Sequence, residues 1–162
     1  MACGDPAGIP QDHFVWRTAS IDDIVETDGQ KWVANFDFSP DVSVYWKEHV
    51  TSHGMTHTDV VDLAPKRNFV FEARASNIRE IVPHDTPLYL VYTPTPGSAP
   101  RCAHSSILLM GLKVKNLSGE NRTRQDSLRR LARDRLRDAF EFVAECPVLA
   151  DSDSENQEIN FE

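Results

Sequence analysis

The chain has 162 residues, of which 40% are hydrophobic and 26% are charged. A chain of this length is expected to form one domain with a buried core. Its formal net charge of -8 at pH 7 argues against general electrostatic attraction to nucleic acid or to an anionic membrane.

The cysteine content and the apolar segments favour an intracellular, reducing compartment. Cys3, Cys102 and Cys146 are scattered and odd in number, and no CxxC pair occurs. That usage is typical of a reducing environment. No secretory signal begins the chain, and no apolar run approaches the length of a membrane span. We therefore expect a cytoplasmic or nuclear protein that does not enter a membrane.

The first half of the chain predicts strands after a mobile start. Residues 1–12 hold two glycines and two prolines and are predicted to form a flexible arm. Residues 13–18 are predicted to form a first strand. Residues 30–38 alternate strongly, which predicts a half-buried strand whose apolar face carries Trp32, Ala34, Phe36 and Phe38.

Residues 39–54 fit two patterns. Ser39, Pro40 and Asp41 resemble a helix start, and Gly54 resembles a helix end. The apolar positions also alternate as they do in a strand, at Val42, Val44 and Trp46. We favour the helix and keep the strand as the alternative.

The remaining elements set the fold class. Strands are predicted at 59–63, 68–75, 88–93 and 105–115, and a helical turn or bent strand at 76–82. One long helix follows all of them. A block of strands before a helix predicts an α+β fold, namely a mainly antiparallel sheet or a partly open barrel packed by a long C-terminal helix. We expect one α+β domain over 13–146 and a disordered acidic tail over 147–162.

The C-terminal helix is predicted over 122–146 and is rich in arginine. Seven arginines and no lysine lie between Arg122 and Arg137. At about 100° per residue, one broad apolar face is formed by Leu128, Leu131, Ala132, Leu136, Ala139, Phe140, Phe142 and Val143. The opposite side carries Arg130, Arg133 and Arg137, beside an acidic strip.

These arginines support two hypotheses about partners. Arg135 projects from the apolar face, either as a side chain extending to water at the rim of the core or as an anchor for a protein partner. The face of Arg130, Arg133 and Arg137 is either solvated or able to bind RNA or phosphate groups, because guanidinium groups bind phosphate in a bidentate manner.

The tail and the histidines offer two further candidate sites. Ile159 and Phe161 alternate within the acidic tail, as in a motif that adds to the sheet edge of a partner; the other interpretation is a solubilising tail. His49, His53 and His57 form an H-x3-H-x3-H spacing, and on a helix the first two would share a face that suits zinc. No cysteine accompanies them and Gly54 interrupts the helix, so solvated histidines are the alternative.

No phosphate-cradling glycine loop and no nucleophile elbow occurs in the sequence. The leading hypothesis is therefore a non-enzymatic protein-interaction module, or adaptor, with a protein partner. The alternatives are an RNA- or phosphate-binding protein that uses the arginine-rich helix, and a metal-dependent enzyme that uses the histidines. No cofactor is expected apart from the zinc of that last alternative. The sequence predicts no oligomeric state.

Overall fold

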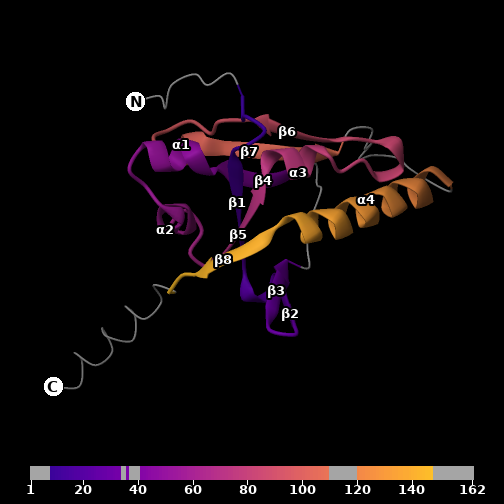
Figure 1. The fold of residues 1–162 in the computed structure, drawn as a ribbon, viewed down its shortest axis with the longest axis horizontal. Helices are drawn as coiled ribbons and strands as arrows, with labels where there is room; N and C mark the ends of the chain where they lie inside the picture. The colour runs from indigo at the N-terminus through magenta and orange to yellow at the C-terminus, as the bar shows by residue number, and fades with distance from the viewer. Residues whose placement is uncertain (1–7, 34–35, 37–40, 110–119, 148–162) are drawn as a thin grey trace.

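The computed structural model describes residues 8–33, 36, 41–109 and 120–147. The described part of the chain holds eight strands, four α-helices and three short 3-10 turns (Figure 1). In chain order they are β1 (Phe14–Ala19), η1 (Ile21–Asp23), β2 (Ile24–Thr27), β3 (Gln30–Val33), β4 (Asp41–Trp46), α1 (Lys47–Ser52), α2 (His57–Val61), β5 (Phe69–Arg74), α3 (Ala75–Arg79), η2 (Pro83–Asp85), β6 (Leu88–Tyr92), η3 (Arg101–Ala103), β7 (His104–Leu109), α4 (Glu120–Ala139) and β8 (Glu141–Glu145).

Six strands form one open sheet in the order β6-β7-β4-β1-β5-β8, and every neighbouring pair is antiparallel. The expected α+β class with a long C-terminal helix is confirmed, and the sheet is open rather than closed into a barrel. Strands β2 and β3 form a separate hairpin, which lies beside β8 in Figure 1.

Core side chains lie on both faces of the sheet, with Val15 on one face and Trp16 and Val70 on the other. Strand register places Val15, Val44 and Ile107 on the same face, and all three are fully buried. Helix α3 contacts β5, β6 and α4, while α4 also contacts η2 and β3. The α4 side chains that enter the core are Leu128, Ala132 and Leu136. Burial of these apolar surfaces is the main stabilising term of the fold.

The favoured helix over 39–54 is wrong for its first half and correct for its second. Residues 41–46 form β4, which lies between β7 and β1, and α1 begins at Lys47. Val42, Val44 and Trp46 are buried while the residues between them are half-buried, which is the strand alternation. Pairing on both sides of β4 therefore overrode a plausible local helix start.

The predicted strand at 59–63 is also wrong, because residues 57–61 form α2. A capping box begins this helix: the Thr56 hydroxyl accepts from the Thr58 amide at 3.3 Å, and the Asp59 carboxylate accepts from the Thr56 amide at 2.8 Å. Val60 and Val61 are buried, and α2 contacts β1 and β5.

The predicted helix over 122–146 ends at Ala139, and β8 follows it. Phe142 and Val143 therefore lie on an edge strand and not on the apolar face of a helix. The pairing of β8 with β5 continues to the end of β8, after which Cys146 donates its amide to the Asn68 carbonyl at 2.8 Å. Pairing with β5 supplies the backbone partners that a longer helix would have supplied internally.

The described part of the predicted N-terminal arm is held against the domain. Ile9 is buried, its carbonyl accepts from Arg79 Nη1 at 2.8 Å, and the Gln11 carbonyl accepts from the Ser76 amide at 3.0 Å. Every helix in the described ranges is too short or too polar to cross a membrane.

Candidate functional site

The arginines of α4 do not share one environment. Arg130 and Arg137 are exposed, whereas Arg133 is half-buried and its Nε is buried without a hydrogen-bond partner. Arg135 is exposed at the rim of the buried stripe, in a surface depression of about 470 Å³ that Asn77, Glu80, Ile81, Asp138 and Ala139 also line. Only two of the three arginines predicted to form a phosphate-binding face are therefore freely presented to solvent.

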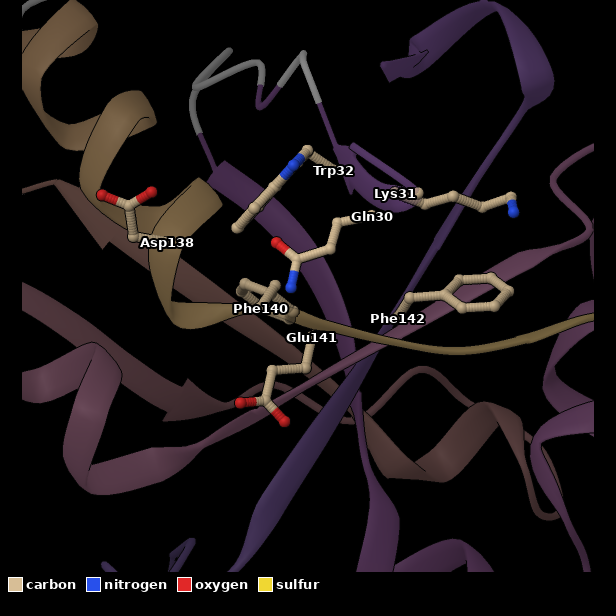
Figure 2. Close-up of a pocket in the computed structure, with 8 residues that line it drawn as sticks. Gln30, Lys31, Trp32, Asp138, Phe140, Glu141 and Phe142 are labelled. Atoms are coloured by element: carbon tan, nitrogen blue, oxygen red, sulfur yellow. The ribbon is translucent and has the colours of Figure 1, made fainter. Parts of the chain in front are cut away.

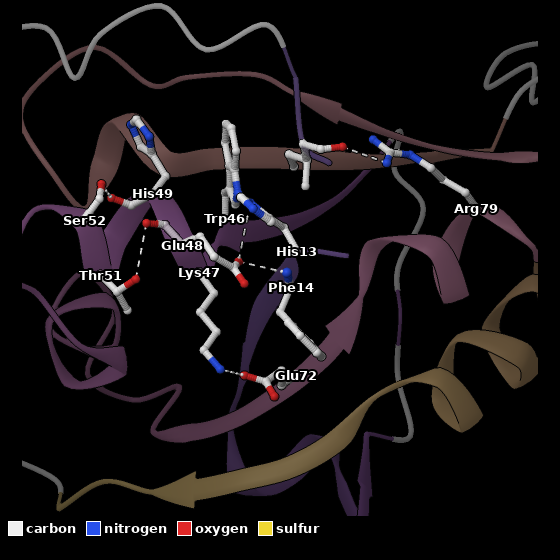
Figure 3. Close-up of polar contacts among 11 residues, drawn as sticks. His13, Phe14, Trp46, Lys47, Glu48, His49, Thr51, Ser52, Glu72 and Arg79 are labelled. Atoms are coloured by element: carbon white, nitrogen blue, oxygen red, sulfur yellow. Dashed lines mark hydrogen bonds and ion pairs between the residues drawn. The ribbon is translucent and has the colours of Figure 1, made fainter. Parts of the chain in front are cut away.

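Only two of the three predicted metal-binding histidines lie close together. His49 and His53 lie with ring centroids 5.0 Å apart, whereas His57 packs edge-on against Trp16 at 5.8 Å. Figure 3 shows His49 beside Trp46, on which its ring stacks at 5.3 Å. Among the described residues, no group of three or more histidine, cysteine or carboxylate side chains is arranged to hold a metal ion.

Of the two described cysteines, one is a free thiol as expected and the other is not. Cys146 is a buried free cysteine, while Cys102 is disulfide-bonded. The Cys102 sulfur lies 3.9 Å from Nε2 of His49, but a disulfide sulfur is not a thiolate nucleophile. Ile159 and Phe161, the predicted tail motif, lie outside the described residues.

A groove between the β2–β3 hairpin and β8 is a candidate binding site. It is a cavity of about 450 Å³ lined by Gly29, Gln30, Lys31, Trp32, Asp138, Phe140, Glu141 and Phe142. Figure 2 shows Trp32 and Gln30 on the hairpin side and the segment with Phe140 and Glu141 on the other. A second cavity of about 250 Å³ shares Trp32 and Asp138 with it and extends to Val25, Thr27 and Arg137.

Local sequence explains both walls of the groove. Asp28 and Gly29 both have positive φ, at 53° and 79°, which is the backbone of a tight two-residue hairpin turn. The turn aligns β2 with β3 and sets Trp32 opposite Val25. On the other wall, Phe140 is buried between α4 and β8, with its ring 5.3 Å from that of Phe36. The floor of the groove is therefore anchored in the core.

The edge strand β8 carries an irregularity beside this groove. Register with β5 pairs Phe142 with Phe71 and Ala144 with Val70, so that Val143 has no partner on β5. This is a β-bulge. Phe142 and Val143 are consequently both exposed, at 39% and 38%, where strict alternation would expose only one of them. In the described part of the chain, no strand pairs with the outer edge of β8.

The charges around the groove are mainly acidic. Asp138, Glu141 and Glu145 are exposed at its margin and along β8. Lys31 is the cation among the lining residues, and its ammonium lies 5.2 Å from the centre of the Phe142 ring. The site therefore combines aromatic walls, an unpaired strand edge and an acidic border.

Sequence reasoning missed this site because it placed Phe142 and Val143 in a helix. The alternation of Phe140, Phe142 and Ala144 against Glu141 and Glu145 was the signal for a strand. No known protein family, curated protein or solved structure matches this chain.

Proposed function

We propose that this protein is a non-enzymatic interaction module that binds an extended segment of a partner protein along the outer edge of β8. The observation that carries the proposal is the exposed pair Phe142 and Val143 on an edge strand without a described partner. Edge strands offer a row of unpaired N–H and C=O groups, and an added strand can satisfy them.

Backbone pairing alone does not select a sequence, and the groove would add selectivity for side chains of the partner. A strand added along β8 presents alternate side chains toward the β2–β3 hairpin, because successive side chains of a strand point to opposite faces. The cavity lined by Trp32, Phe140 and Phe142 has room for a large apolar side chain of the partner.

The acidic residues on β8 and the net charge of the chain indicate the kind of segment that would bind there. Glu141 and Glu145 are exposed near the two ends of β8, and the whole chain carries a formal charge of -8. A second copy would bring the same acidic residues to the same edge, and like charges suppress that pairing. The complementary ligand is an extended peptide with apolar residues at its centre and lysine or arginine on both flanks.

Binding of designed peptides tests the proposal. One labelled ten-residue peptide has alternating valine and threonine between lysine flanks, a second has glutamate flanks, and a third carries N-methylated backbone amides. We expect saturable binding of the lysine-flanked peptide by fluorescence anisotropy, with an affinity at least about tenfold weaker for the other two.

A matched pair of protein variants locates the site. Val143→Lys places a charge on the exposed pair of β8 and should weaken binding by about tenfold. Tyr89→Lys makes the same change on the other edge strand, β6, where Tyr89 is 44% exposed, and should leave binding unchanged. Equal loss in both variants, or full binding of the N-methylated peptide, would overturn strand addition at β8.

A further inference from the structure

The two edge strands of the six-stranded sheet differ in charge. Strand β8 carries Glu141 and Glu145, whose charges oppose pairing with a second copy of the chain. Strand β6 has the sequence LYLVY, without a charged residue, and within the described part of the chain it pairs with β7 alone. An uncharged edge of apolar and aromatic residues is a template for the addition of another strand. Protection of the β6 edge must therefore come from outside the strand.

The hydrogen bonds of β6 identify which of its backbone groups face outward. Thr93, directly after β6, donates its amide to the His104 carbonyl of β7 at 3.2 Å. Residues bonded to the neighbouring strand alternate with residues that are not, because the ladder is antiparallel. Leu88 and Leu90 are out of phase with Thr93, so they direct their amide and carbonyl groups away from β7. An added strand would need to pair with these outward groups.

Two of the outward groups already have partners from within the chain. The Leu88 amide donates to the Ile81 carbonyl at 3.1 Å. The Leu90 carbonyl accepts a hydrogen bond from Arg79 Nη2, also at 3.1 Å. The guanidinium of Arg79 thus stands where an added strand would donate its amide to β6.

The N-terminal segment, residues 9–11, holds Arg79 in this position. Arg79 Nη1 donates to the Ile9 carbonyl at 2.8 Å and to Gln11 Oε1 at 2.9 Å. The segment is itself anchored, because the Ile9 side chain is 4% exposed and the Gln11 carbonyl accepts from the Ser76 amide at 3.0 Å. One guanidinium therefore joins the N-terminal segment, α3 and the edge of β6.

We propose that Arg79, held by the N-terminal segment, is a cap that prevents β6 from pairing with β6 of a second copy of this chain. Removal of the cap converts the β6 edge into a surface for self-association. A second copy is the occupant that fits, because two identical strands paired antiparallel form a closed two-fold dimer. The uncharged β6 does not repel its own copy, and it offers no carboxylate to the basic flanks of the peptide proposed for β8.

Sedimentation velocity of the full chain over a concentration series tests the cap. We expect the intact chain to sediment as one species whose mass does not depend on concentration. Arg79→Ala removes the donor from the Leu90 carbonyl, so its mass should rise with concentration from that of one chain toward that of two. Circular dichroism shows whether the variant is folded.

A conservative variant decides the outcome if Arg79→Ala does not fold. Arg79→Lys keeps the charge and an aliphatic stem, but one ammonium lacks the planar fork that reaches Ile9, Gln11 and Leu90 together. We expect Arg79→Lys to associate as well, at higher concentration than Arg79→Ala. A single species at every concentration in the folded variants overturns the proposal.

Matched variants show whether β6 is the surface that associates. Arg130→Ala removes an exposed arginine of α4 and should leave the mass unchanged. Adding Tyr89→Lys to Arg79→Ala should restore the single species, because Tyr89 is 44% exposed on β6 and like charges on paired strands repel. Adding Val143→Lys on β8 instead should leave the association intact. Association of Arg130→Ala, or association that persists with Tyr89→Lys, overturns the assignment to β6.

Discussion

Glu72 is the common acceptor of a partly buried network on the outer face of the sheet. It accepts from Lys47 Nζ at 2.6 Å and from the Trp16 indole N–H at 3.1 Å (Figure 3 shows the contact with Lys47). Lys47 also lies 5.1 Å from the centre of the Phe14 ring. The buried indole therefore keeps a hydrogen-bond partner, which a buried donor requires to avoid a desolvation cost.

His49 makes the stability of the fold depend on pH. Burial, followed by the charge of His53, lowers the pKa of His49 below its ordinary value. The unfolded chain therefore binds more protons than the folded one once the pH falls through about 6.5. We expect the contribution of neutral His49 to the free energy of unfolding to be complete above about pH 7. The free energy of unfolding should then decrease as the pH falls through about 6.5 toward the lower pKa of the folded state.

Urea unfolding at a series of pH values between about 7.5 and 5.5 measures this dependence. His49→Gln should flatten the decrease. The control is His84→Asn, because His84 is exposed and asparagine tolerates its positive φ of 46°. If His84→Asn flattens the curve as much as His49→Gln, burial of His49 is not its cause.

Helix α4 ends at its junction with β8 because of tertiary contacts and not because of local sequence. No proline or glycine lies between Ala139 and Glu145, so local propensity would permit the helix to continue. The chain instead turns at Phe140, whose side chain is 1% exposed and packs against Phe36. Core packing of one aromatic ring and pairing with β5 therefore fix where the helix stops.

Two alanine variants compare the phenylalanines on either side of this junction. Phe140→Ala should lower the free energy of unfolding by about 3–5 kcal/mol, because it opens a cavity in the core. Phe142→Ala should cost only about 1 kcal/mol, since its ring remains partly in solvent on the edge strand. Urea unfolding of both variants checks the difference, and equal costs would contradict the placement of Phe142 on an exposed edge.

At the scale of the whole molecule, Cys146 joins the C-terminal end of the described fold to the start of β5. The Asn68 side chain donates to the Cys146 carbonyl at 2.8 Å, and the Cys146 amide donates to the Asn68 carbonyl at the same distance. This double contact ties the end of β8 to the start of β5. The last core side chain of the described ranges is that of Cys146.

Truncation tests whether the domain ends there. A chain that stops after Pro147 should unfold at the same urea concentration as the full chain, within about 0.5 kcal/mol. A chain that stops after Ala139 loses Phe140 and β8 and should be largely unfolded. Circular dichroism during urea titration separates the two, and a marked loss of stability in the longer truncation would show that residues 148–162 contribute to the core.

Local patterns in the sequence were enough for the fold class and for several elements. The strands β1, β5 and β6 and most of the long helix α4 were predicted, because alternation and helical spacing are carried by neighbouring residues. The same patterns failed where two structures suit one segment, as at 41–46 and 141–145. There the choice depends on which strand lies alongside, and that information is held by distant residues.

The candidate site beside β8 depends on such distant residues. The groove needs Trp32 beside Phe142, and these residues lie on separate strands, β3 and β8. No spacing rule links these positions, because contacts between separate strands are created only when the sheet assembles. Local propensity and hydrophobic period therefore account for the kinds of element in this protein, whereas pairing and burial across the sheet decided their ends and the sites between them.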